Sequence, residues 1–211
     1  MKLTLYNTAH SGPSFRVRIA LALKGLDYEY VPVDLKARGH KAAAYVARNP
    51  QGLLPTLEVD GVALTQSGAI VEWLDETFPA PPLFPRDALL RARVRAVAAI
   101  IATDIAPLHS MRVSIAVHKE FGQGDAGLKA WVHRFIGDGF RAIEALLTQL
   151  EGPYCCGGQP TVADIYLVPA VYVAKNAGFD VAAFPRLAAA AARASEHPAF
   201  VAAHSARQPD A

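Results

Sequence analysis

Strand-like alternation of apolar and polar residues is concentrated before Asp87, and this uneven distribution constrains the fold more than any other feature. Before Asp87, four short segments alternate apolar and polar residues as half-buried strands do. They are residues 2–7, 28–33, 56–59 and 62–65. After Asp87, apolar residues recur at spacings of three and four, most clearly over Leu90–Ile105 and Leu128–Leu150, which is typical of amphipathic helices. The sequence therefore predicts an α/β domain followed by an all-helical one.

The order of elements in the first part predicts a small mixed sheet. A helical segment that Gly25 ends stands between the first two strands, and strands joined in this way usually pair in parallel. Asp60-Gly61 is typical of a two-residue hairpin turn and makes the last two strands antiparallel neighbours. Further helices are predicted over Leu35–Asn49, with loose ends, and over Ala69–Thr77.

A proline-rich run, Pro79–Pro85, cannot continue a helix and is expected to connect the two domains. We therefore place the domains at residues 1–80 and 86–211. In the second domain, Thr161–Asp164 has the form of a capping box, with aspartate where glutamate is usual. Asp164 is accordingly interpreted as a residue that serves folding.

The composition argues against several classes of protein. The 21 Lys and Arg residues nearly balance the 19 Asp and Glu residues, and no long run of one charge suggests a nucleic-acid surface. No stretch approaches the about 20 uninterrupted apolar residues of a membrane span, and Met1–Leu3 leads into a strand pattern without a signal peptide, so we expect a cytoplasmic protein. Cys155 and Cys156 are adjacent, cannot form an ordinary disulfide, and are interpreted as partly buried small residues. Neither a Gly-rich phosphate loop nor a zinc-type spacing is present, so no metal is expected.

A short polar turn, Ser11–Ser14, runs directly into the first helical segment. A helix N-terminus carries unpaired N–H groups and about half a positive charge, so an anion is favoured beside it. Pro13 suits the first turn, and Ser11 or Gly12 suits the cap. Taken alone, this stretch leaves two interpretations of Ser11 open, a simple helix cap and a catalytic hydroxyl.

Together with this turn and the order of elements, Leu54-Pro55, Gln66-Ser67 and the Thr161–Asp164 box give the chain a resemblance to the glutathione transferases. Within that family it is most similar to the zeta class, the maleylacetoacetate and maleylpyruvate isomerases, above all over Arg16–Tyr28. Further similar stretches are 49–57, 66–74, 104–105, 167–169 and 207–210. The resemblance covers essentially the whole chain. It implies a thioredoxin-like, glutathione-binding N-terminal domain and an all-α C-terminal domain that forms the acceptor-substrate pocket.

The resemblance also implies glutathione as the cofactor and assigns residues to its parts. Ser11 would donate a hydrogen bond to the thiolate, and Ser14, one helical turn on, is the second candidate. Ser67, at a helix N-terminus, would bind the γ-glutamyl carboxylate with help from Gln66. If Pro55 is cis, Leu54 would offer its backbone to the cysteinyl peptide. His40 falls where relatives place a polar side chain near the glycyl end, although an exposed loop histidine is an equally good interpretation.

The chain departs from the family pattern at several positions. Family members commonly have a Ser-Ser-Cys-Ser run, and here Gly12 and Pro13 replace its second serine and its cysteine. The arginine that usually precedes the run is His10, and an arginine expected for the substrate carboxylate aligns near Asn176. The substrate-binding candidates are therefore His10, Ser110, Arg112 and Lys175. For Arg112 and Lys175, a role as solvated helix-surface charges is an equally good interpretation.

Three functions follow as hypotheses. The first is a glutathione-dependent cis–trans isomerase of aromatic catabolism, in which a thiolate adds to a cis double bond, the resulting single bond rotates, and elimination regenerates glutathione. The alternative is a general glutathione transferase or dehalogenase acting on small electrophiles such as α-haloacids, which consumes the thiol. The third is a non-catalytic binding module. The expected partners are a small carboxylate-bearing electrophile and a second copy of the chain in a homodimer, with neither nucleic acid nor membrane.

Overall fold

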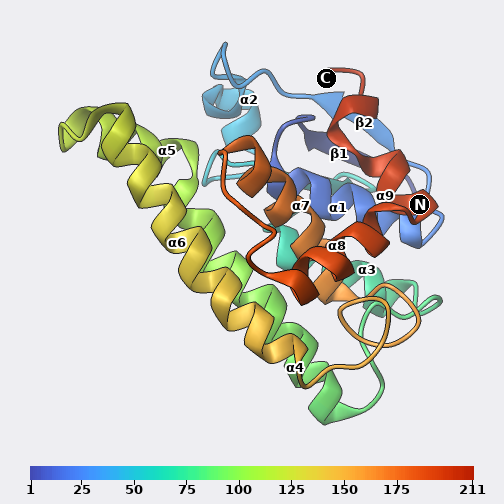
Figure 1. Ribbon diagram of the computed structural model, residues 1–211. Coiled ribbons are helices and arrows are strands. Elements are labelled where there is room, and N and C mark those ends of the chain that lie inside the picture. The colour runs from blue at the N-terminus through green and yellow to red at the C-terminus, as the bar shows by residue number, and fades with distance from the viewer. The chain divides into compact units, whose positions relative to one another are not determined.

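The computed structural model describes the chain from Met1 to Ala211, which divides into two compact units (Figure 1). The first unit contains Met1–Leu83 together with Glu196–Ala211, and the second contains Phe84–Ser195. The division falls between Leu83 and Phe84, inside the proline-rich run that the sequence predicts to connect residues 1–80 to residues 86–211. The prediction that the second domain extends to residue 211 is wrong. Residues Glu196–Ala211 belong to the first unit, because this C-terminal segment packs against the first helix of that unit.

The sheet of the first unit has four strands in the order β2-β1-β3-β4. Their bounds are β1 Leu3–Asn7, β2 Glu29–Pro32, β3 Thr56–Val59 and β4 Val62–Thr65. β1 is parallel to β2 and antiparallel to β3, and β3 is antiparallel to β4 across the Asp60-Gly61 turn. The predicted βαβ unit and hairpin are therefore confirmed.

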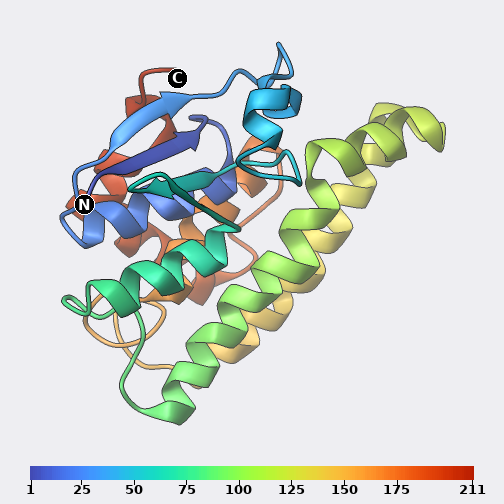
Figure 2. The ribbon, with the colours of Figure 1, turned by 180° about the vertical axis from the view of Figure 1, so that it is seen from behind.

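The two longer helices of the first unit pack together, and one of them also packs against the C-terminal segment. α1 (Gly12–Leu23) packs against α3 (Ser67–Thr77) and against α9 (Pro198–Ala203), and Figure 2 shows α1 and α3 side by side along the sheet. A short 3₁₀ turn, η5 (Ser205–Arg207), follows α9. The apolar side chains that these elements share are fully buried: Leu5, Ile19, Leu57, Ile70 and Leu74.

The helix predicted over Leu35–Asn49 is wrong in its extent. Only a 3₁₀ turn, η1 (Gly39–Lys41), and one α-helical turn, α2 (Ala43–Val46), form there. The Asp34 carboxylate accepts hydrogen bonds from the N–H groups of the second and third residues after it, at 2.7 and 3.0 Å. Arg38 then takes a left-handed conformation with a φ of 58°. This Asx turn competes with the helix and delays its start until Ala43, despite the favourable alanines and lysines.

The second unit is entirely helical, as predicted. Its elements are α4 (Ala88–Ala99), η2 (Ile100–Ile105, a π-helix), η3 (Ala106–His109, 3₁₀), α5 (Met111–Ile115), η4 (Ala116–Glu120, π), α6 (Gly124–Leu147), α7 (Val162–Asn176) and α8 (Pro185–Ser195). Gly139 of α6 lies so close to Ile105 that a Cβ built there would be 2.4 Å from the Ile105 Cδ1 atom. This glycine is what allows α6 and the π-helical turn to pack together. None of the helices combines the length and the apolar character that crossing a membrane requires.

The predicted capping box at the start of α7 is confirmed. The Asp164 carboxylate accepts from the Thr161 N–H at 2.8 Å, from the Thr161 hydroxyl at 3.1 Å and from the Cys155 N–H at 2.8 Å. Burial raises the pKa of Asp164, while these hydrogen bonds act in the opposite direction. Cys155 and Cys156 are free thiols and are buried more completely than the partial burial expected from sequence. Asp164 therefore joins the start of α7 to the loop before it.

Candidate functional site

The connections that carry the predicted site residues meet at one edge of the sheet. In the register of the strands, Tyr6 stands opposite Thr56, and Thr56 stands opposite Thr65. The chain leaving β1, the chain entering β3 and the chain leaving β4 therefore all lie at the same end of these three strands. The turn at Ser11, the Leu54-Pro55 pair and the Gln66-Ser67 pair belong to these connections, so the sheet brings them together.

Ser11 is the N-cap of α1. Its hydroxyl oxygen accepts a hydrogen bond from the Ser14 N–H at 3.2 Å, and its own N–H donates to the Thr8 carbonyl at 3.3 Å. The side chain is half-buried. Because the hydroxyl acts as an acceptor toward the helix, its proton remains available to a group outside it. A hydroxyl donor and the positive end of a helix thus act on the same point.

Ser14 has a different environment from Ser11. Its side chain is fully buried, and its hydroxyl oxygen has no hydrogen-bond partner. Of the two serines that the sequence leaves as alternatives, Ser11 is therefore partly accessible and Ser14 is not.

The Leu54–Pro55 peptide bond is cis, as the family resemblance implied. The loop before it is fixed through the Leu53 carbonyl, which accepts from the Tyr45 hydroxyl at 2.7 Å and from the Asn49 amide at 2.8 Å. Leu54 itself is half-buried, and its N–H and carbonyl have no partner within the chain. These two groups are placed as the free edge of a strand is, ready to pair with an extended peptide.

Gln66 and Ser67 mark the start of α3. Gln66 has a φ of 67°, an uncommon conformation for a residue with a side chain, and its amide donates to the Gln51 side chain. Ser67 is buried, and the Arg16 guanidinium donates to its hydroxyl oxygen at 3.4 Å. A buried cation, a hydroxyl and a helix N-terminus therefore converge where a carboxylate was predicted to bind.

His40 is buried, with 6% of its surface exposed, so the interpretation as an exposed loop histidine is wrong. Burial lowers the pKa of its imidazole, and the neighbouring charges of Lys41 and Arg38 lower it further. Its Nδ1 atom is buried without a hydrogen-bond partner. The Lys41 ammonium donates to the Gln51 and Gly52 carbonyls at 3.2 and 3.0 Å. His40 thus offers an unused polar atom in the segment predicted to lie near the glycyl end of glutathione.

The four substrate-binding candidates are divided between the units. His10 is exposed in the turn before Ser11, in the first unit. In the second unit, the Ser110 hydroxyl donates to the Pro107 carbonyl at 2.7 Å, while Arg112 on α5 and Lys175 on α7 are exposed. The glutathione-binding candidates, in contrast, all belong to the first unit.

Two buried arginines of α1 are not among the residues that the sequence predicts for the site. Arg16 has 5% of its surface exposed and Arg18 has none. The signal was present, because both stand within the otherwise apolar helical run from Phe15 to Leu21. Arginine is rarely buried in full without several hydrogen-bond partners, so two of them in such a run indicate a polar structure inside the fold.

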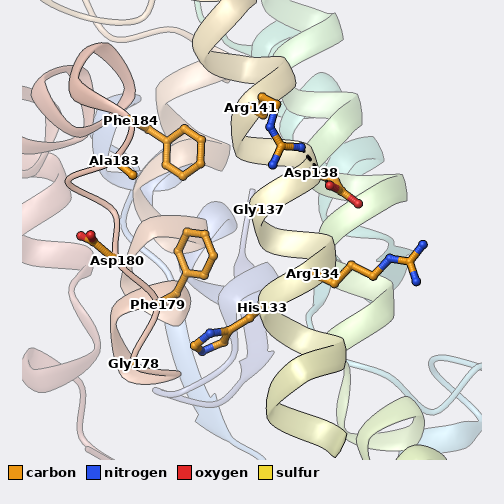
Figure 3. A pocket seen from close by; sticks show the side chains of 10 residues that line it. All are labelled: His133, Arg134, Gly137, Asp138, Arg141, Gly178, Phe179, Asp180, Ala183 and Phe184. Atoms are coloured by element: carbon orange, nitrogen blue, oxygen red, sulfur yellow. Dashed lines mark hydrogen bonds and ion pairs between the residues drawn. The ribbon is translucent and has the colours of Figure 1, made fainter.

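A groove in the second unit contains none of the predicted site residues. Figure 3 shows the side chains that line it, on α6 and on the loop before α8. Its volume is about 500 Å³. Phe179 and Phe184 stack there with ring centroids 6.1 Å apart, and the His133 ring meets Phe179 edge to face. Arg141 is paired with Asp138 at 2.9 Å, and Arg134 points away from the rings. We interpret the groove as part of the aromatic packing between α6 and the loop before α8.

The chain is similar to known proteins over nearly its full length. Residues 1–76 match the glutathione S-transferase N-terminal domain, and residues 129–193 match the C-terminal domain. A maleylacetoacetate isomerase from Pseudomonas aeruginosa PAO1 is 44% identical over 211 residues, which cover 99% of this chain and 98% of that protein. The solved holo structure of a maleylpyruvate isomerase, described as a bacterial zeta-class glutathione S-transferase, is 45% identical, covers 99% of both chains and superposes with a TM-score of 0.96. The chain belongs to the zeta class of the glutathione S-transferases.

A further similar solved structure contains bound ligands. It is a maleylacetoacetate isomerase from Methylobacterium extorquens AM1 with bound malonate and GSH, 34% identical to this chain, with 99% of both chains covered and a TM-score of 0.94. The thioredoxin-like and helical domains expected from the sequence are therefore confirmed for this zeta-class chain.

Proposed function

We propose that this chain is a glutathione-dependent cis–trans isomerase of the maleylacetoacetate or maleylpyruvate type. The observation that carries the proposal is the 44–45% identity, over nearly the full length, to proteins that bear these two names. The sheet edge that joins Ser11, Leu54 and Ser67 supports it, because a module without catalysis has no need of all three groups together.

The residues of the first unit fit glutathione, a tripeptide with two carboxylates and one thiol. Ser67 and the α3 N-terminus would bind the γ-glutamyl carboxylate, with the Arg16 guanidinium behind the hydroxyl and Gln66 beside it. The unpaired Leu54 peptide groups would pair with the cysteinyl residue. The orphaned Nδ1 atom of His40 would receive a partner at the glycyl end.

Ser11 would act on the charge of the sulfur. When bound, glutathione supplies the thiolate that adds reversibly to a cis double bond and so permits rotation about it. The Ser11 hydroxyl donates its free proton toward this sulfur, and the N-terminus of α1 adds its positive partial charge. A thiol with an ordinary pKa of about 8.5 is only a few per cent ionised at neutral pH, so stabilising the thiolate raises the reactive fraction directly. Burial of Ser14 favours Ser11 over it in this role.

For the substrate we propose a small dicarboxylate or keto acid. The structure of the Methylobacterium relative with bound malonate and GSH supports a carboxylate-bearing ligand. His10, Ser110, Arg112 and Lys175 are our candidates for its carboxylates. Arginine binds a carboxylate through two parallel hydrogen bonds, which lysine and histidine cannot do, so Arg112→Ala is expected to raise KM for the substrate more than Lys175→Ala does.

The test of the proposed function is stoichiometric. The purified chain, given maleylacetoacetate or maleylpyruvate with a catalytic amount of glutathione, is expected to form the fumaryl isomer while the free thiol stays constant. With an α-haloacid, the alternative dehalogenase would release halide and consume thiol in proportion. Loss of thiol matched to substrate turnover, or no isomerisation with either maleyl compound, would contradict the isomerase.

Ser67→Ala is expected to weaken glutathione binding by about ten- to a hundredfold, because a hydrogen bond to a charged group contributes about 1.5–3 kcal/mol. Calorimetric titration of glutathione into the variant measures the dissociation constant. Ser195→Ala is the control, since the Ser195 hydroxyl donates only to the Ala191 carbonyl of its own helix. Equal affinity in the Ser67→Ala variant and the control would remove Ser67 from the proposed site.

We also propose that the chain forms a homodimer in a reducing compartment, the cytoplasm. Large apolar side chains are exposed in both units, among them Val62 at 65% and Leu89 at 63%. The cytoplasm keeps glutathione, the proposed cofactor, in its reduced form, which fits this compartment. Sedimentation equilibrium at micromolar concentration is expected to give twice the mass of the chain, and a single-chain mass would refute the dimer.

A further inference from the structure

The turn that precedes Ser11 is held from two sides. The Arg18 guanidinium donates to the Thr8 carbonyl at 3.1 Å and to the Ala9 carbonyl at 3.0 Å. The Asp210 carboxylate accepts from the Thr8 hydroxyl at 2.9 Å and from the Ala9 N–H at 3.1 Å. Arg18 thus donates two hydrogen bonds to Thr8 and Ala9, and Asp210 accepts two from the same residues. These four charge-assisted bonds restrict the backbone of the turn.

Arg18 makes only contacts with neutral groups. Besides the two turn carbonyls, it donates to the Asn7 side-chain oxygen at 2.9 Å and to the Ala203 carbonyl at 3.0 Å. Burial lowers the pKa of its guanidinium, although Arg18 remains a cation. Its planar fork reaches several acceptors at fixed angles, which a lysine ammonium cannot do. The buried Arg18 guanidinium therefore donates to the carbonyls of this turn and to adjacent groups, and these hydrogen bonds fix the geometry of the turn.

Asp210 links the same turn to the sheet. Its second oxygen accepts from the Tyr30 hydroxyl, which belongs to β2. Burial raises the pKa of Asp210, but hydrogen bonds from Tyr30, Ala9 and Thr8 outweigh it and hold the pKa below its ordinary value. The carboxylate is therefore charged at neutral pH, and each of its oxygens has a fixed partner.

The turn determines where Ser11 points. The Ser11 N–H donates to the Thr8 carbonyl, the same oxygen that Arg18 binds. Ser11 is also the N-cap of α1, so its backbone is shared between the turn and the helix. A shift of the turn would move the Ser11 hydroxyl, and displacements of about 1 Å at a reacting group can cost about a hundredfold in rate.

We propose that Arg18 and Asp210 are positioning residues that fix the Thr8–Ser11 turn and thereby the direction in which the Ser11 hydroxyl donates. The inference rests on the proposed function. Neither residue touches the sulfur, and both act through the backbone that carries Ser11.

Asp210→Asn is the principal test, because the amide keeps the shape of the carboxylate but loses its charge and one acceptor position. The readout is the pKa of the thiol of bound glutathione, followed by thiolate absorbance in the binary complex without substrate. The thiol pKa is expected to rise by about one unit, and kcat at neutral pH is expected to fall about tenfold. The KM for glutathione is expected to change by no more than about threefold, since Ser67, Leu54 and His40 form no contact with Asp210.

Two further variants separate positioning from stability. Gln208→Ala is the matched control, because the Gln208 amide ties the same C-terminal segment to the Ala202 and His204 carbonyls without touching the turn. It is expected to lower the melting temperature and leave the thiol pKa unchanged. Thr8→Val removes only the hydroxyl bond to Asp210, and serves if the Asp210 variant does not fold. It is expected to raise the thiol pKa by a smaller amount.

The outcomes distinguish the two proposals. If the wild-type protein isomerises its substrate with a lowered thiol pKa, while the Asp210→Asn and Thr8→Val variants match Gln208→Ala in both thiol pKa and kcat, the positioning role is overturned and the function stands. If the wild-type protein binds glutathione with an ordinary thiol pKa and does not isomerise, the proposed function fails first. A raised thiol pKa in the turn variants alone supports the positioning role.

Discussion

The Ser11→Ala variant is expected to lose about a hundred- to a thousandfold in kcat/KM for isomerisation, the usual effect of removing one donor to a developing or stabilised anion. The loss is expected in kcat, with a small change in KM for glutathione, because Ser67 and the Leu54 peptide groups remain. Steady-state kinetics at neutral pH with saturating glutathione measures it. Ser11→Gly isolates the hydroxyl from the helix cap, since glycine replaces a capping serine at a cost of only a few tenths of a kcal/mol.

Ser14→Ala is the matched control for Ser11→Ala. The Ser14 hydroxyl is buried and forms no hydrogen bond, so its removal is expected to leave kcat/KM within about twofold and to cost little stability. A collapse of activity in Ser14→Ala together with near-normal activity in Ser11→Ala would transfer the catalytic role to Ser14.

The Asp164→Ala variant is expected to lower the free energy of unfolding by about 3–5 kcal/mol. The substitution leaves the buried N–H groups of Thr161 and Cys155 without acceptors, at about 1–3 kcal/mol each, and removes the Asp164 half of the capping box of α7. Urea denaturation followed by far-ultraviolet circular dichroism measures this change in stability. Asp164 belongs to the helical unit, so the helical signal reports its loss.

Asp138→Ala provides the comparison on an exposed helix face. Asp138 pairs with Arg141 at 2.9 Å, both side chains are more than half exposed, and an exposed ion pair contributes about 0–1 kcal/mol. If Asp164→Ala and Asp138→Ala changed the unfolding free energy by the same small amount, Asp164 would not be the folding residue that the structure indicates.

Much of the fold was predictable because local signals and packing agree. The alternation in Leu3–Asn7 and the Asp60-Gly61 turn gave the strands and their directions, and the Thr161–Asp164 spacing gave the start of α7. The helix predicted over residues 35–49 does not form as one helix. Helix propensity cannot show that the Asp34 carboxylate accepts hydrogen bonds from the backbone just after it and bends the chain. Propensity is a weak prior that such local bonds override.

The residues of the candidate site could be named from sequence where the family resemblance assigns single residues, but the burial and the hydrogen bonding of their side chains could not. Ser11 as a cap and Ser67 at a helix start follow from sequence, but the orphaned Nδ1 of His40 does not. The contact between Thr8 and Asp210 joins residues 202 positions apart, and no periodicity in a single sequence reports a pair at that separation. The buried arginines were visible in sequence, and only the structure identifies their partners.

The central claim is that Ser11 and the start of α1 stabilise the thiolate of bound glutathione, and the most direct measurement is the pKa of that thiol. Titration of thiolate absorbance in the binary complex is expected to give a pKa clearly below the ordinary value of about 8.5 in the wild-type protein, and a value close to it in Ser11→Ala. A thiol pKa that is ordinary in the wild-type complex, or lowered equally in both proteins, would contradict the claim.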